Sequence, residues 1–242
     1  MERIEYERLA AVEERAWWFH GLHTNLVDAW RRAAKDNDGR VLDAGCGTGG
    51  LLTRLTRAFP AAQPYGLELD QLAAATARAK SGASVAAASI TQPPFAAASL
   101  DAIFSADVLC HRGVEPAATL DALAPCLKSG GILILNLPAY RWLFSGHDRA
   151  VDNVRRFSRG ETRDLLAKAG FTRIRICYWN SFLFPLMVLQ RLIHRASSSD
   201  VALLPAPVER LFRTIVEWEA RLGRCGLRLP FGGSILAIAV KP

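Results

Sequence analysis

The residues best suited to do chemistry in this sequence form a glycine-rich turn, "VLDAGCGTGG", at residues 41–50. Its glycines Gly45, Gly47 and Gly49 let backbone approach a ligand closely, and the helix that follows would offer its N-terminal amides. A pyrophosphate suits such a turn, and so does the carboxylate of an amino acid. By glycine count the turn fits the dinucleotide fingerprint G-x-G-x-x-G. Asp43, however, has no part in that fingerprint.

A second acid, Glu68 in "PYGLEL", stands about twenty residues beyond the turn. A carboxylate at the end of the strand that follows such a turn can accept hydrogen bonds from both hydroxyls of a ribose. The glycines alone are a weak signal, whereas strand, turn, helix, strand and acid together are a strong one. We therefore expect a site for an adenosine-containing cofactor.

Hydrophobic periodicity places the turn in a chain where strands and helices alternate. Expected strands cover residues 40–45, 64–69, 83–89, 100–108, 130–138, 171–179 and 233–241, and expected helices cover residues 2–35, 49–59, 71–80, 116–128 and 158–170. This order predicts an α/β fold with a doubly wound, mostly parallel sheet and helices on both faces. In such a sheet ligands bind beyond the carboxyl ends of the strands. The last two strands lack a crossover, because residues 180–233 look like an insertion.

The composition of the chain limits its domain size, its partners and its cellular location. The chain has 242 residues, enough for one large domain with a sizeable core. Its formal charge of +7 would favour an anionic partner, but the arginines are scattered among acids, which is typical of a solvated surface. The five cysteines lie far apart and form no C-x-x-C pair, so we expect no metal site and no disulfide framework. With no signal peptide and no apolar run long enough for a membrane span, we expect a cytoplasmic protein.

The motifs around the turn resemble those of the class I S-adenosylmethionine-dependent methyltransferases. "VLDAGCGTG" closely matches their first motif, including the acid, and "YGLELD" is similar to their second. "SITQPPFAAASLDAIFSADVLCH" is similar to the third and fourth, and "LKSGGILILNLP" to the strand that follows. The resemblance implies a seven-stranded Rossmann-like sheet with an antiparallel last strand. It also implies an N-terminal helical cap at residues 1–37 and a methyltransferase domain at residues 38–242, with a helical insertion at about 181–232.

By this resemblance the cofactor is S-adenosylmethionine and its product is S-adenosylhomocysteine. Asp43 would orient the amino-acid part near its ammonium group, and Glu68 would hold the ribose. Ser89 and Ile90 would flank the adenine, and many relatives carry Asp in place of Ser89. The residues implied for cofactor binding are Asp43, Gly45, Cys46, Gly47, Gly49, Glu68, Leu69, Ser89, Ile90 and Ala106. A nicotinamide cofactor would leave Asp43 unexplained.

Candidates for a general base follow the strands that point at this site. Methyl transfer is an in-line displacement, so the enzyme chiefly aligns the acceptor with the methyl carbon. A base is needed only if the acceptor arrives protonated, as a hydroxyl does. The catalytic candidates are His111, Tyr140 and His147, the last beside Asp148. His111 also fits a place in the cofactor wall, so both roles stay open.

Two further segments resemble a bacterial small-molecule methyltransferase subgroup: "LPAYRWLFSGHDRAVDNVRRFSRGETRDLLAKAGF" and the N-terminal "EERAWWFHGLHTNLV". The residues they make candidates for acceptor binding are Trp17, Trp18, Arg155 and Arg156. The arginines either bind an anionic group on the acceptor or pair with nearby acids. The sequence departs from the subgroup at His23, where an Arg is usual, and at Asn153, where a His is common.

The predicted insertion also bears on the acceptor. "FLFPLMVLQRLIHR" is apolar and then basic, and "PVERLFRTIVEWEARL" has apolar residues along one helix face. Two helices packed on the domain explain this pattern; the alternative is a hydrophobic lid for a lipophilic acceptor, with peripheral membrane contact. The leading hypothesis is O-methylation of a small, rather apolar acceptor, with no nucleic acid as partner. A nucleic-acid or protein methyltransferase and a non-catalytic S-adenosylmethionine-binding protein are the alternatives.

Overall fold

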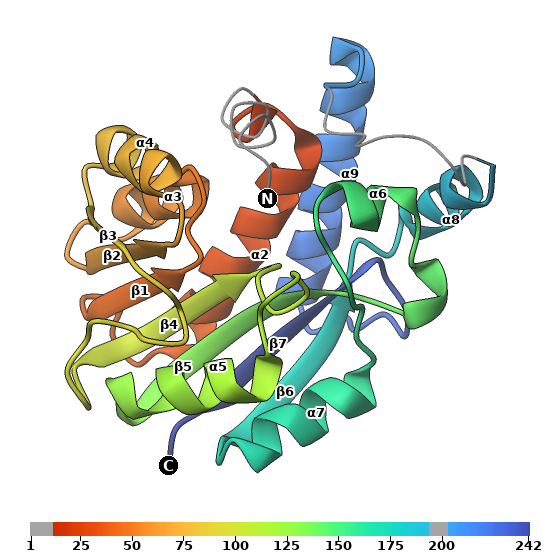
Figure 1. Cartoon of the computed structure of the whole chain (residues 1–242). Coiled ribbons are helices and arrows are strands. Elements are labelled where there is room, and N and C mark those ends of the chain that lie inside the picture. Colours follow the sequence, from red (N-terminus) through yellow and green to blue (C-terminus); the bar gives the residue numbers. More distant parts are fainter. Residues whose placement is uncertain (1–11, 194–202) are drawn as a thin grey trace.

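The computed structural model describes residues 12–193 and 203–242, and its centre is one seven-stranded sheet (Figure 1). The strand order is β3-β2-β1-β4-β5-β7-β6, so the chain starts near the middle and winds outward in both directions. The first five strands are parallel, and β7 is antiparallel to both of its neighbours, which confirms the predicted fold class. The strands are β1 (Arg40–Ala44), β2 (Gln63–Glu68), β3 (Ser84–Ala87), β4 (Leu100–Ala106), β5 (Leu127–Pro138), β6 (Thr172–Trp179) and β7 (Ser234–Val240).

Helices cover both faces of the sheet (Figure 1). The helices α2, α3 and α4 pack on one face, and α5 and α7 pack on the other. Two more, α8 and α9, lie between β6 and β7, where the sequence predicts a helical insertion. The helices are α2 (Trp17–Ala33), α3 (Gly50–Ala58), α4 (Gln71–Ser81), α5 (Pro116–Leu123), α6 (Gly146–Ala150), α7 (Arg159–Lys168), α8 (Phe184–Ile193) and α9 (Ala206–Arg224).

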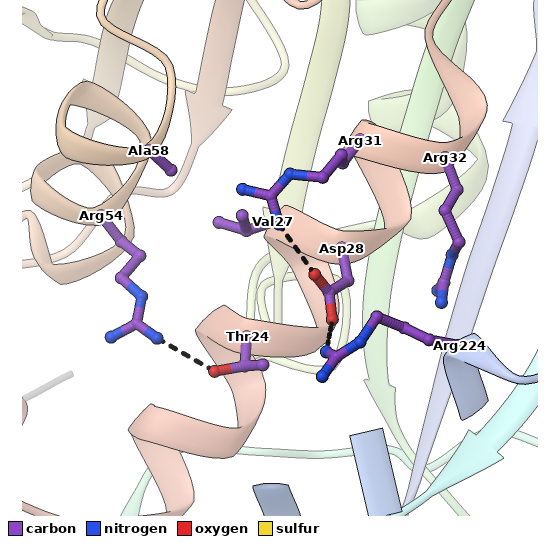
Figure 2. Close-up of a pocket in the computed structure, with 8 residues that line it drawn as sticks. All are labelled: Thr24, Val27, Asp28, Arg31, Arg32, Arg54, Ala58 and Arg224. Carbon is purple, nitrogen blue, oxygen red and sulfur yellow. Dashed lines mark hydrogen bonds and ion pairs between the residues drawn. The ribbon is translucent and has the colours of Figure 1, made fainter. Parts of the chain in front are cut away.

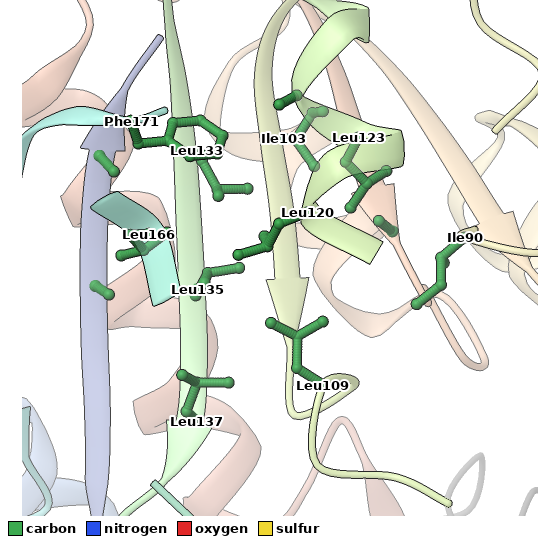
Figure 3. Close-up of a cluster of buried hydrophobic side chains, with 14 of the residues drawn as sticks. Ile90, Ile103, Leu109, Leu120, Leu123, Leu133, Leu135, Leu137, Leu166 and Phe171 are labelled. Atoms are coloured by element: carbon green, nitrogen blue, oxygen red, sulfur yellow. The ribbon is translucent and has the colours of Figure 1, made fainter. Parts of the chain in front are cut away.

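The alternation of side chains along the central strands builds two halves of the core. On β4, Ile103 belongs to the cluster beneath α5 and α7, while Phe104 belongs to the cluster beneath α2 and α3. Leu133 and Ile134 alternate in the same way on β5. Figure 3 shows the first cluster, with Leu120 of α5 pointing toward the sheet. Because both faces are covered, these strands read as nearly continuous apolar runs.

One edge of the sheet collects the loops that carry the predicted site. The strands β1 to β5 all end at this edge, and β6 ends there too, because it is antiparallel to β7, which is antiparallel to β5. The glycine turn follows β1, Glu68 ends β2, and His111 and Tyr140 follow β4 and β5. We call this the carboxyl edge. Ligands of doubly wound sheets bind at such an edge.

The helix expected over residues 116–128 is shorter than the sequence suggests. It ends at Leu123, and a single 3₁₀ turn (Ala124–Cys126) leads directly into β5. Pro125 explains the difference, because it has no backbone N–H with which to continue the helix. The short helix α6 and the 3₁₀ turn before it (Arg141–Leu143) are not predicted, since segments of this length have no measurable periodicity.

The N-terminal cap predicted at residues 1–37 contains α2, and its residues 1–11 lie outside the described residues. This helix packs against β5, β7 and α3 and runs along α9. The boundary at residue 37 stays a prediction. Within residues 12–193 and 203–242, no helix has the length and apolar character needed to cross a bilayer.

Candidate active site

The glycine turn requires glycine at two of its positions. Gly45 has a φ of +85° and Gly49 a φ of +86°, in the left-handed region that side chains rarely adopt. A Cβ at Gly45 would collide with the side chain of Val108, and one at Gly49 would lie 2.7 Å from the Cα of Ala77. The turn is therefore pressed against the loop after β4 on one side and against α4 on the other.

Asp43, which precedes the turn, carries a buried carboxyl group. Its exposed fraction is 2%, and no residue in the described part of the chain donates a hydrogen bond to its side chain. Burial raises the pKa of Asp43 well above its ordinary value, and the carboxylates of Glu13 and Glu68 raise it further. A buried acid is costly unless a cation or a donor meets it. An ammonium group would be both.

Glu68 is fixed at the carboxyl edge by two backbone donors. Its carboxylate accepts hydrogen bonds from the N–H of Gly47, at 2.9 Å, and of Asp70, at 3.1 Å. Leu69, the next residue, is 73% exposed. A fixed carboxylate beside an exposed apolar side chain offers what a nucleoside requires, an acceptor for its hydroxyls and a surface for its base.

The other residues predicted to bind the cofactor differ in burial and in the direction of their side chains. Ile90 is buried, and the hydroxyl of the half-buried Ser89 forms a hydrogen bond of 2.8 Å with that of Thr91. Ala106 ends β4 at the carboxyl edge. The side chain of Cys46 packs into the apolar cluster between α3 and α4. Only the backbone of Cys46 is therefore available to contact a ligand at the glycine turn.

A comparison with protein families matches residues 42–135, from β1 through most of β5, to the methyltransferase domain. These residues therefore form a methyltransferase domain, which supports an enzyme that depends on S-adenosylmethionine. No curated protein matches it in sequence.

Solved methyltransferase structures share the fold of this methyltransferase. An S-adenosylmethionine-dependent methyltransferase of Thermotoga maritima is 19% identical, with a TM-score of 0.63 over 98% of this chain and 95% of that one. A complex of the Trm112 methyltransferase activator of Haloferax volcanii with a methyltransferase gives 23% identity and a TM-score of 0.64, over 99% and 97%. The geranyl diphosphate C-methyltransferase of Streptomyces coelicolor, solved with S-adenosylhomocysteine, gives 16% and 0.59, over 89% and 78%.

The residues at the turn fit S-adenosylmethionine. No described residue donates to the carboxyl group of Asp43, and the ammonium group of the methionine part would supply that partner. Glu68 ends β2, the strand next to β1, and its carboxylate could accept hydrogen bonds from the ribose. When bound, the cofactor supplies a methyl group on a positively charged sulfur.

His111 lies in the loop after β4, against the segment that follows α6. An isolated β-bridge joins it to Asn153, and the side-chain oxygen of Asn153 accepts a hydrogen bond from the Cys110 thiol at 3.0 Å. Burial lowers the pKa of His111 below its ordinary value, so its imidazole is neutral near pH 7. His111 is thus in the neutral form, which can accept a proton from an acceptor.

Tyr140 is part of a cluster of five aromatic rings, which we call the aromatic wall. It stacks on Tyr178 at 5.3 Å between ring centroids, with Phe184 at 5.6 Å and Trp142 at 5.8 Å. Phe231 joins through Phe184, at 5.8 Å. Burial, with help from Tyr178, raises the pKa of Tyr140 to about 12. Its phenol therefore stays protonated near pH 7 and suits a hydrogen-bond donor or an apolar surface better than a base.

His147 and Asp148 lie on α6, which is anchored from several sides. Asp148 is fully buried and pairs with Arg156 at 2.8 Å and with Arg191 at 3.0 Å. It also accepts a hydrogen bond from the backbone N–H of Ser145, at 2.9 Å. Burial alone raises the pKa of Asp148, but the two arginines outweigh it and hold that pKa below its ordinary value. Asp148 is thus an ionised anchor for α6, the helix that also carries the half-buried His147.

The paired arginines bind parts of this chain. Arg156 is 5% exposed and, besides pairing with Asp148, donates to the carbonyl of Ala139 at 2.9 Å. Arg155 donates to the carbonyl oxygens of Leu109, at 3.3 Å, and Val114, at 2.5 Å, in the loop after β4. Of the two roles that the sequence leaves open, Arg156 thus pairs with an acid, while Arg155 binds backbone. Both guanidinium groups are occupied, so we do not propose them as ligands of the acceptor.

Trp17 and Trp18 begin α2 and connect it to the end of β6 and to α9. Trp18 stacks on Trp179 at 4.8 Å, and the indole N–H of Trp179 donates to the side-chain oxygen of Asn136 at 2.7 Å. Trp17 packs edge-on against Phe212 of α9 at 5.4 Å. The two tryptophans therefore hold the start of α2 beside the carboxyl edge.

Glu13 is a site residue that sequence reasoning missed. It is buried, accepts hydrogen bonds from the hydroxyl of Thr48 at 2.7 Å and the N–H of Gly50 at 3.1 Å, and pairs with Lys80 at 2.9 Å. Glu13 thus fastens the N-terminal segment to the glycine turn. No local signal reveals it, because all of its partners lie far along the chain.

Asp107, just after β4, is a second missed residue. Its φ is +55°, one carboxylate oxygen accepts a hydrogen bond from the Asn136 amide at 2.9 Å, and the other is buried with no partner among the described residues. Burial raises the pKa of Asp107 to about 7, although Asn136 and Arg156 oppose the shift. A signal exists in the sequence: Asn136 is the lone polar residue in "ILILNLP", and Asp107 ends "AIFSAD".

The raised pKa of Asp107 makes stability depend on pH. Because the pKa is about 7 in the folded state and ordinary when unfolded, folding favours the protonated form, and stability falls as pH rises from about 4 to 7. The Asp107→Asn variant keeps an acceptor for Asn136 and removes the charge. We compare the free energy of unfolding of this variant with that of the wild type at two pH values. The advantage of the variant should be larger at pH 8 than at pH 4.5, by about 2–4 kcal/mol. Urea unfolding at the two pH values measures this; an equal difference at both would contradict it.

Proposed function

We propose that this methyltransferase methylates the oxygen of a small, largely apolar acceptor by in-line displacement. The observation that carries the proposal is the aromatic wall at the carboxyl edge. Its rings come from the segment after β5 (Tyr140 and Trp142), the last residues of β6 (Tyr178), the start of α8 (Phe184) and the segment before β7 (Phe231). Aromatic side chains line the pockets of apolar ligands and exclude water. Positive charge disappears during methyl transfer, so a water-poor pocket suits the transition state.

Cofactor binding is assigned residue by residue in this proposal. Asp43 holds the ammonium group of the methionine part, and the glycine turn passes beneath that part. Glu68 accepts the ribose hydroxyls, while Ser89 and Ile90 flank the adenine. The support is the buried carboxyl group of Asp43, to which no described residue donates, and the fixed carboxylate of Glu68.

His111 is the proposed general base, and His147 is the second candidate. A hydroxyl must lose its proton as its oxygen attacks, and a neutral imidazole can take that proton. The lowered pKa of His111 and its place after β4 support this role. In this proposal the protonated phenol of Tyr140 positions the acceptor by donating a hydrogen bond.

Exposed apolar side chains next to the aromatic wall support a lipophilic acceptor. Trp142, which belongs to the wall, is 62% exposed. Nearby in the sequence, Phe182 just before α8 is 47% exposed, and Leu186 and Leu189 on α8 are 48% and 54% exposed. An apolar surface beside an aromatic pocket suits the entry of a molecule that partitions out of water. Peripheral membrane contact through this surface stays a prediction.

The acceptor class is tested with matched pairs of compounds and methyl-labelled S-adenosylmethionine. Each pair has the same aromatic or isoprenoid skeleton and carries either a hydroxyl or an amine. We expect label on the hydroxyl compounds, with rates that rise as the skeleton becomes more apolar. Faster labelling of the amines, or of hydrophilic acceptors, would overturn the proposal.

The His111→Ala variant separates a base from a wall residue. If the imidazole takes the proton, turnover falls by about 100-fold or more while the Kd for S-adenosylmethionine changes little. Turnover rates and calorimetric titration measure the two quantities. A parallel loss in both would place His111 in the cofactor wall.

A further inference from the structure

A groove lined with arginines lies on the face of the molecule that α2, α3 and α9 form. It measures about 370 Å³, and its polar lining consists of Thr24, Asp28, Arg31, Arg32, Arg54 and Arg224 (Figure 2). Arg31 and Arg32 belong to the last turn of α2, while Ala58 is the last residue of α3. These ends lie away from the glycine turn, which precedes α3. The groove is thus separate from the candidate active site, and we call it the arginine groove.

The arginine groove carries more positive charge than its acids neutralise. Its lining includes four guanidinium groups and a single carboxylate, Asp28. One oxygen of Asp28 pairs with Arg31 at 3.1 Å and the other pairs with Arg224, so both oxygens are used (Figure 2). Arg32 forms no ion pair with any residue that the structure describes.

Arg54 shows most clearly that a negative partner would fit. Its guanidinium reaches across the groove and donates to a neutral group, the hydroxyl of Thr24, at 3.1 Å (Figure 2). Burial lowers the pKa of Arg54, and the nearby Arg213 lowers it further. Two acids offset this repulsion, Glu217 and Asp28. Glu217 is itself paired with His20 at 2.7 Å, and Asp28 is paired with Arg31 and Arg224. A guanidinium that loses water without gaining a carboxylate is a binding group for an anion.

We propose that the arginine groove binds a small phosphorylated molecule through Arg54 and Arg32, with further N–H donors from Arg31 and Arg224. Guanidinium groups match phosphate oxygens by donating pairs of parallel hydrogen bonds. The volume lies within the range of small-molecule sites. Val27 and Ala58 add apolar lining for the organic part. An anion bound here ties α2, α3 and α9 together, because each helix supplies at least one of the arginines.

Inorganic diphosphate is the probe that tests this proposal. At about ten times its Kd, diphosphate should raise the Tm of the protein by roughly 3–5 °C relative to sodium chloride of the same ionic strength. The Arg54→Gln variant should lose this shift and bind diphosphate at least about tenfold more weakly by calorimetry. The matched control is Arg163→Gln, which removes the same charge from the exposed surface of α7 and should behave as the wild type.

Each other outcome would overturn the proposal. No rise in Tm with diphosphate would mean that the groove holds no phosphate. An equal shift in the Arg54→Gln and Arg163→Gln variants would mean a general attraction of anions to the net charge. Vesicles of phosphatidylcholine with phosphatidic acid form a separate arm: binding to them without any response to soluble diphosphate would replace the small molecule by a lipid surface. Titration of the Arg54→Gln variant with S-adenosylmethionine shows whether the variant is folded, because the proposed cofactor site is separate from the groove.

Discussion

The Asp43→Asn variant is expected to lose S-adenosylmethionine while becoming more stable. Asp43 is buried, meets no donor among the described residues, and has a pKa raised by burial and by Glu13 and Glu68. Removing its charge relieves that cost, so the free energy of unfolding at pH 8 should rise by about 2 kcal/mol, an effect that vanishes as pH falls below the ordinary range of aspartate. The same change removes the proposed partner of the cofactor's ammonium group, so the Kd for S-adenosylmethionine should rise by roughly 100-fold or more.

Calorimetric titration and urea unfolding measure the two effects of Asp43→Asn on one preparation. Glu68→Gln is the companion variant, expected to weaken cofactor binding through the ribose without the gain in stability, because Glu68 already accepts two backbone hydrogen bonds. Asp164→Asn, on the exposed surface of α7, is the matched control and should change neither quantity. Wild-type affinity in both Asp43→Asn and Glu68→Gln would refute the assigned cofactor site.

The second large effect is expected at Asp148. The Asp148→Asn variant leaves Arg156, whose side chain is 4% exposed, as a buried charge without an acid, and it also removes the partner of Arg191. Breaking a buried pair in this way costs about 3–5 kcal/mol of folding free energy. Because the pKa of Asp148 is held below its ordinary value, the wild type should lose the same stabilisation as pH falls through the acid range.

Urea unfolding at pH 7 measures the loss in Asp148→Asn. The control is Arg112→Ala, which breaks the Arg112–Asp152 pair, where the arginine side chain is 74% exposed. That pair should contribute less than about 1 kcal/mol. A loss in Asp148→Asn no larger than in the control would show that Asp148 is not the anchor of α6.

Local patterns explain why the sheet and the glycine turn are predictable from the sequence. The strands β1, β4 and β5 are apolar runs because both faces are covered, and the turn is marked by glycines that the backbone requires. Asp43 and Glu68 stand at set distances from that turn, so their positions at the carboxyl edge follow from the parallel strand order. The end of α5 could also have been predicted, since Pro125 is visible in the sequence.

Long-range pairing explains what the sequence did not reveal. Glu13 reaches Thr48 and Lys80, and nothing in the spacing of these residues indicates that they meet. The paired arginines look like anion ligands until the structure shows Arg156 against Asp148. Burial decides the remaining cases, because only the folded chain shows that the side chain of Cys46 turns into a core cluster.

O-methylation of an apolar acceptor is tested most directly by following labelled methyl groups from S-adenosylmethionine into a cell extract. The purified methyltransferase is incubated with the extract, and the small molecules, protein and nucleic acid are then separated and counted. We expect label in small molecules that partition into organic solvent, located on oxygen by mass spectrometry, and no label above background with the Asp43→Asn variant. Label in the protein or nucleic-acid fraction, or equal labelling by that variant, would contradict this expectation.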